Sequence, residues 1–121
     1  MMNCLIVGLG GFIGSVCRYL IGLIPINERY VFPVKTFAIN IIGCFIIGII
    51  AAASLKNTAL NPKLVLLLKV GVCGGFTTFS SFALETGDLM KNVDLLTALA
   101  YVVLSAFLGV LAVFAGQAVI K

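Results

Sequence analysis

Hydrophobic residues run along this chain in long blocks that short polar segments separate. The blocks cover about residues 3–24, 36–55, 64–90 and 95–120. A helix needs roughly 20 apolar residues to cross the ~30 Å hydrocarbon core of a membrane, and each block is long enough. The pattern therefore predicts an all-α membrane protein in which residues 1–121 form a single domain of four transmembrane helices.

The composition excludes a water-soluble domain. Of the 121 residues, 62% are hydrophobic and 10% are charged, and the mean hydropathy is +1.25. A soluble domain of this size buries only about 60–70% of the surface of its unfolded chain, too little to hide so many apolar side chains. The net charge of +4 comes from scattered basic residues, without the cluster that a nucleic-acid-binding face needs. We expect membrane lipid, and no nucleic acid, around this chain.

The basic residues divide evenly between the two sides of the membrane. With four spans, both termini and the second connector share one side. That side holds Lys56, Lys63, Lys69 and Lys121, and the other holds Arg18, Arg29, Lys35 and Lys91. Because an excess of Lys and Arg on one side sets orientation, an even division predicts insertion in both orientations and an antiparallel homodimer. A fixed orientation with one residue misplaced is the alternative.

Small residues recur at the spacing of tightly packed membrane helices. Gly10 and Gly14 form a G-x-x-x-G pair, and so do Gly71 and Gly75. Such pairs let two helix backbones approach closely. We take them as support for a tight oligomer.

The third span contains a stretch, residues 71–82, that is unusual for a membrane helix. Its Gly74-Gly75 pair predicts a break, and a break at membrane depth is tolerated only inside protein or beside a wet or ion-filled cavity. Hydroxyls alternate there with rings that would share one face at i, i+3 and i+6. The hydroxyl residues are Thr77, Thr78, Ser80 and Ser81, and the rings are Phe76, Phe79 and Phe82. Because ring edges carry positive charge, the rings form either a packing stripe or an anion-friendly surface.

Other polar residues lie inside the spans, where each is a candidate functional group. Arg18 is either an anchor that reaches the membrane interface or a charge that attracts anions. Asn40 either bonds a neighbouring helix or donates its amide to an anion. Glu85 follows on the face of Thr78 and Ser81, where it could relay, gate or pair with a basic residue.

The fourth span continues this polar track. Tyr101 and Ser105 lie on one of its faces, four residues apart. One such track per chain is too little to enclose a pore, but a dimer could complete it.

Three motifs together resemble the small fluoride channels of prokaryotes, the Fluc or CrcB-like family. They are Gly10-Gly11-x-x-Gly14-x-x-x-Arg18-Tyr19, Thr36-x-x-x-Asn40-x-x-Gly43 and Gly71-x-x-Gly74-Gly75-x-Thr77-Thr78-Phe79-Ser80-Ser81-Phe82. The resemblance covers essentially the whole chain. Two positions depart from it: Ser81 stands where the family commonly has threonine, and Lys35 stands where a small residue is usual.

The resemblance implies a passive, fluoride-selective channel in the prokaryotic plasma membrane. It also implies an antiparallel dual-topology homodimer with two pores, each using both subunits. By the family pattern, Asn40 donates to fluoride, and Phe79 and Phe82 meet the ion with their ring edges. The other pore residues implied are Thr78, Ser80, Ser81, Tyr101, Ser105 and Glu85, with Arg18 near the mouth. HF crosses membranes and dissociates in the cytoplasm, so a passive anion pore lets the trapped ion leave.

The resemblance further implies a structural sodium ion at the dimer centre, bound by backbone carbonyls at the helix break. These map onto Gly74 and Thr77. Oxygen ligands suit such a hard cation.

Two other classes remain in view. A small multidrug-type cation/proton antiporter also has four spans and dual topology, but it needs a carboxylate in the first helix, and Glu85 is the sole candidate substitute. A non-transporting assembly factor would explain the packing glycines but not the Thr/Ser/Phe stretch. Neither an ATP-binding motif nor a catalytic constellation is recognisable, so we expect no enzyme activity.

Overall fold

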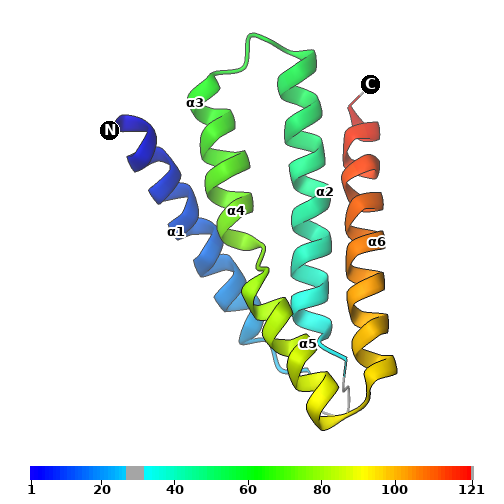
Figure 1. The fold of residues 1–121 in the computed structure, drawn as a ribbon. Coiled ribbons are helices and arrows are strands. Elements are labelled where there is room, and N and C mark those ends of the chain that lie inside the picture. The colour runs from blue at the N-terminus through cyan, green and yellow to red at the C-terminus, as the bar shows by residue number, and fades with distance from the viewer. Residues whose placement is uncertain (27–31, 121) are drawn as a thin grey trace.

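The computed structural model describes residues 1–26 and 32–120 as an all-helical protein (Figure 1). Four helical segments are long and apolar enough to cross a membrane, which confirms the predicted fold class. They are α1 (Met2–Gly22), α2 (Val34–Lys56), the interrupted third span (Pro62–Asn92) and α6 (Leu95–Val119). Their ends lie within two residues of the predicted ones. Arg29 and Lys121, two of the residues in the predicted charge balance, lie outside the described residues.

Both chain ends and the α2–α3 turn lie at one end of the molecule, and the α5–α6 turn lies at the other (Figure 1). Capping residues mark these turns. Asn61 accepts a hydrogen bond from the amide of Lys63, with Pro62 in the first turn of α3, a position that proline favours. Asp94 Oδ1 accepts from the amide of Thr97 at 2.6 Å, which lowers the pKa of the Asp94 carboxyl and begins α6.

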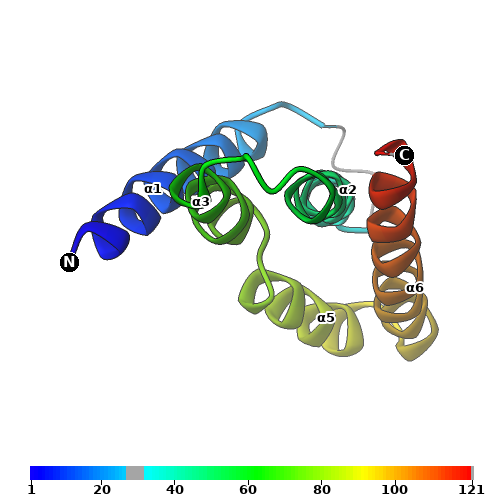
Figure 2. The same cartoon turned by 90° about the horizontal axis from the view of Figure 1, so that it is seen from above.

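Glycines let the helices pack backbone to backbone. A Cβ at Gly75 would lie 2.6 Å from the carbonyl oxygen of Gly11, and a Cβ at Gly14 would overlap the carbonyl oxygen of Val72. The two G-x-x-x-G pairs therefore pack on each other within one chain. They therefore give no support for an oligomer, because each pair is already used in the contact between α1 and the third span. On the other side α2 packs along α6 (Figure 2).

The third span changes geometry several times along its length. It begins as α3 (Pro62–Val65), continues as a π-helix η1 (Leu66–Val72) and returns to α-helix in α4 (Cys73–Phe76). An extended link then leads to α5 (Ser80–Asn92).

The predicted break is present, but its predicted position at Gly74-Gly75 was wrong. Both glycines are helical, and the chain leaves the helix at Thr77, whose φ and ψ are −78° and 160°. Gly75 does not form a turn; its missing side chain lets the third span pack closely against α1. The break begins at Thr77, two residues after Gly75, where side chains replace the lost helical bonds.

Candidate functional site at the helix break

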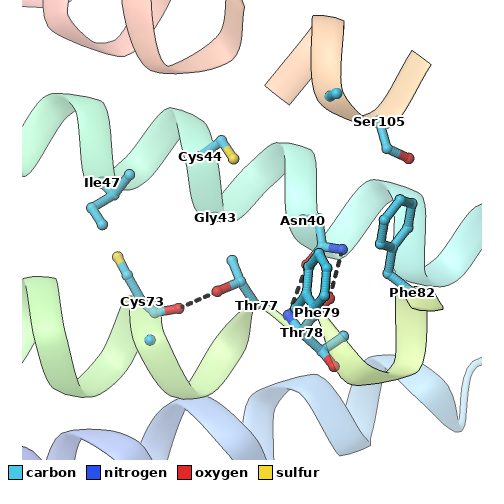
Figure 3. Close-up of a pocket in the computed structure, with 12 residues that line it drawn as sticks. Asn40, Gly43, Cys44, Ile47, Cys73, Thr77, Thr78, Phe79, Phe82 and Ser105 are labelled. Atoms are coloured by element: carbon cyan, nitrogen blue, oxygen red, sulfur yellow. Dashed lines mark hydrogen bonds between the residues drawn. The ribbon is translucent and has the colours of Figure 1, made fainter. Parts of the chain in front are cut away.

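Asn40 on α2 holds the break in place through two hydrogen bonds to Thr78 (Figure 3). The Thr78 amide donates to Asn40 Oδ1 at 2.8 Å, and Asn40 Nδ2 donates to the Thr78 carbonyl at 3.1 Å. The Asn40 carboxamide thus donates one hydrogen bond to the Thr78 backbone and accepts another from it. A side-chain amide carries two N–H donors, so one N–H of Nδ2 is left for a ligand.

The break also frees two backbone carbonyls. In a continuous helix the amide of residue i bonds the carbonyl of residue i−4, so Thr78 would bond Gly74 and Ser81 would bond Thr77. Instead the Thr78 amide bonds Asn40, and the Ser81 amide donates to Thr78 Oγ1 at 3.1 Å. Gly74 and Thr77 are therefore left without their helical donors.

Arg18 supplies a fourth side-chain hydrogen bond at the break. Its Nε donates to the carbonyl of Gly75 at 3.2 Å, across 57 residues of sequence. The sequence left two roles open, and the structure places this guanidinium against the break. A guanidinium has five N–H donors, so four remain after this bond.

The first of two hollows beside the break is named the ring hollow here. It measures about 400 Å³ and is lined by Asn40, Gly43, Cys44, Ile47, Cys73, Gly74, Thr77, Thr78, Phe79, Phe82, Ser105 and Ala106 (Figure 3). The Phe79 and Phe82 rings both line this space, and their centroids lie 5.8 Å apart with the ring planes tilted by 53°. Phe76 precedes the extended link, so the predicted face of three rings was wrong.

The second hollow, named the charged hollow, measures about 550 Å³. It is lined by Ser15, Arg18, Tyr19, Gly22, Leu23, Lys35, Thr36, Ile39, Thr78, Ser81 and Glu85. Lys35 Nζ donates to the carbonyl of Gly22, the last residue of α1, at 2.7 Å. Thr78 belongs to both hollows, so they meet at the break.

Several polar atoms near the two hollows are buried and unpaired. Glu85 Oε1, Tyr101 OH and Ser105 Oγ have no hydrogen-bond partner among residues 1–26 and 32–120. Tyr101 is fully buried, and its ring packs behind Phe82 at a centroid distance of 5.0 Å. Buried polar groups without partners are costly, so these atoms are candidates to bond a ligand or water.

Comparison with known proteins identifies the family. The family model described as "CrcB-like protein, Camphor Resistance (CrcB)" matches residues 5–117. The chain belongs to this family. Relatives named "Fluoride-specific ion channel FluC" match over the full chain: the protein of Chlorobaculum tepidum is 46% identical over 121 residues, covering 100% of this chain and 96% of its own. Those of Gloeothece citriformis and Rhizobium meliloti are 45% and 40% identical over 122 residues, covering 100% of this chain and 98% of their own.

The CrcB resemblance inferred from the motifs is thus confirmed, and the structure brings most of the expected residues together. Asn40, Gly74, Thr77, Thr78, Phe79, Phe82 and Ser105 meet in the ring hollow, and Arg18, Ser81 and Glu85 meet with Thr78 in the charged hollow. Tyr101 lies behind Phe82 instead of lining either space. Ser80 is exposed at the start of α5 and lines neither of these two hollows.

Sequence reasoning assigned no site to some lining residues. Cys44 and Cys73 line the ring hollow, but nothing in the sequence distinguishes them from packing thiols. Lys35 is noticeable in the sequence only as a departure from the family pattern. Its bond to Gly22, thirteen residues away, could not be read from the pattern.

Proposed function

We propose that this protein is a passive, fluoride-selective ion channel. The observation that carries the proposal is the full-length match to relatives named fluoride-specific ion channels, together with the helix break at which the expected residues meet. With four hydrophobic spans, it is a multi-pass protein of the prokaryotic plasma membrane. It moves an ion and catalyses no reaction, so it is not an enzyme.

The ring hollow could bind a small anion through hydrogen-bond donors, and no Lys or Arg lines it. The free N–H of Asn40 and the hydroxyls of Thr78 and Ser105 can donate to the ion. The edges of Phe79 and Phe82 carry positive charge and bind an anion weakly. A conducted ion must be held tightly enough to enter and loosely enough to leave, and weak, repeated donors meet this requirement.

We expect the working channel to be an antiparallel homodimer with two pores, each built from both subunits. Phe79 is 79% exposed, and Gly74 is exposed with no atom near its Cβ position. The ring hollow therefore has an open side that a second subunit could close. The even division of Lys and Arg supports insertion in both orientations.

A structural sodium ion fits the carbonyls of Gly74 and Thr77. Both have lost their helical donors, and Gly74 is exposed. Carbonyl oxygens are the ligands that hard cations prefer. No group of three His, Cys, Asp or Glu able to hold a metal occurs within the described residues, so backbone oxygens are the remaining candidates there. When bound, the ion would supply a fixed positive charge that stabilises the freed carbonyls between α4 and α5.

The antiporter alternative is disfavoured because α1 contains no carboxylate. Purified protein in liposomes, loaded with fluoride and held at zero pH gradient by a proton ionophore, separates the two classes. A channel releases fluoride at an unchanged rate when the pH gradient is collapsed. Transport that stops without a proton gradient would contradict the channel proposal.

A further inference from the structure

Two cationic side chains in the charged hollow, Lys35 and Arg18, each donate a hydrogen bond to a backbone carbonyl. Lys35 Nζ donates to Gly22, which ends α1, and Arg18 Nε donates to Gly75, close to the end of α4. The carboxyl end of a helix carries partial negative charge and free carbonyls, so each bond holds its cation in a defined place.

Each cation uses only one of its donors in these bonds. An ammonium group has three N–H donors and a guanidinium has five, so both retain donors and full charge for a ligand. The hollow is also lined by five hydroxyl residues, Thr78 and Ser81 among them, and by one carboxylate, Glu85. Two positive charges against one negative charge leave the hollow with a net positive charge.

The charged hollow adjoins the ring hollow at Thr78. An anion bound beside Lys35 and Arg18 would therefore be separated from the ring hollow only by Thr78. The hollow is too polar to be a packing defect, because charged and hydroxyl groups supply a large part of its lining.

We propose that Lys35 is a loading residue of this channel: with Arg18 it concentrates small anions in the charged hollow, from which they pass to the ring hollow. This rests on the proposed function, and it assigns a role to a residue at which this chain departs from its family pattern. Lys35 acts on the local concentration of fluoride, and selection among anions belongs to the ring hollow.

The test measures the rate of fluoride efflux from liposomes as a function of fluoride concentration, for the wild type, Lys35→Gln, Lys35→Arg and Lys91→Gln. Lys91 is an exposed lysine near the end of α5, so its substitution removes the same charge on the same side of the membrane. At low ionic strength we expect Lys35→Gln to raise the half-saturating fluoride concentration about threefold, the effect of one unit charge about 7 Å away in water-like surroundings. The maximal rate should not change, and Lys35→Arg and Lys91→Gln should behave as the wild type.

Salt distinguishes this role from a structural one. At about 1 M ionic strength the Debye length is only ~3 Å, so the difference between Lys35→Gln and the wild type should disappear. Equal losses at both salt concentrations would mean that Lys35 only caps α1 and would overturn the proposal. So would a Lys35→Gln variant that matches Lys91→Gln at low salt, or a Lys35→Arg variant as impaired as Lys35→Gln.

The lipid distinguishes a free anion from a lipid phosphate. The measurement is repeated in vesicles of phosphatidylcholine alone and of phosphatidylcholine with phosphatidylglycerol. We expect the Lys35→Gln effect in both, and an effect confined to the anionic vesicles would assign the hollow to a lipid headgroup instead. A wild type that conducts no fluoride would contradict the proposed function itself, which is a separate outcome.

Discussion

At the scale of single residues, Asn40 has a structural role at the helix break that its polar side chain alone does not reveal. It bonds both backbone groups of Thr78 at the point where the helix is interrupted. Asn40 also lines the ring hollow, so its remaining N–H is a candidate donor there. One residue therefore shapes the break, and in the proposed channel it would also offer a donor to the ion.

Asn40→Ala should destabilise the protein and abolish fluoride flux. Removing the amide leaves the Thr78 N–H and C=O without partners, at a cost of about 1–3 kcal/mol for each buried group. Thermal unfolding in detergent and liposome efflux measure the two effects. Asn40→Asp is the matched variant, since it still accepts from the Thr78 amide but cannot donate to its carbonyl. Unchanged stability of Asn40→Ala would contradict the role assigned to Asn40 at the break.

Phe82→Ile should reduce fluoride flux while leaving the oligomeric state unchanged. The aliphatic side chain keeps most of the apolar contact with Tyr101 but offers no positive ring edge. Aromatic edge interactions contribute about 0.5–1.5 kcal/mol, so a loss of up to about tenfold in rate is expected. Efflux and size-exclusion chromatography check this, with Phe79→Ile as the companion variant. If both rings can be made aliphatic without loss of flux, they do not contact the ion.

At the scale of elements, the third span is positioned by the backbone contact between α1 and η1. Two glycines one turn apart in α1 face different surroundings. A Cβ at Gly14 would overlap the Val72 carbonyl oxygen, whereas a Cβ at Gly11 would meet no atom within 4 Å.

Gly14→Ala should therefore lower the melting temperature, and Gly11→Ala should not. Forcing a methyl group into a packed contact costs about 1–3 kcal/mol, while alanine in an open helical position has up to about 1 kcal/mol better helix propensity than glycine. Melting curves in detergent, read by fluorescence-detected chromatography, compare the two variants directly. Equal melting temperatures would contradict the close α1–η1 packing.

The elements also show what sequence reasoning can and cannot locate. Block length and hydropathy determine the four spans because crossing a membrane requires a minimum apolar length. The break was foreseen but misplaced at Gly74-Gly75, because a glycine pair looks the same whether it serves a turn or a close helix contact. The true position depends on Asn40, 38 residues away, and no local pattern contains that pairing. The π-helix Leu66–Val72 has no sequence signal that we can identify.

The clustering of the candidate site residues could be predicted where they are adjacent in sequence, and less well elsewhere. The stretch from Gly74 to Phe82 supplies five of the twelve residues that line the ring hollow, and its motif also identifies the family. The separate charged hollow could not be predicted, because it requires the end of α1 to meet the starts of α2 and α5.

At the scale of the whole molecule, the arrangement of the ends agrees with the side assignment used for the charge balance (Figure 1). An even balance predicts two populations of opposite orientation. A cysteine-free variant with a single reporter cysteine after residue 121 should be labelled from both sides of intact cells by a membrane-impermeant reagent applied before and after permeabilisation. Labelling from one side alone would contradict dual topology and favour a fixed orientation.

The most direct test of fluoride-selective conduction compares two anions in one preparation. Purified protein is reconstituted into liposomes loaded with equal concentrations of fluoride and chloride, and ion-selective electrodes follow both while a potassium ionophore dissipates the membrane potential. We predict rapid release of fluoride with chloride retained until detergent is added. Fluoride retained with the chloride, or both ions released together, would contradict a fluoride-selective channel.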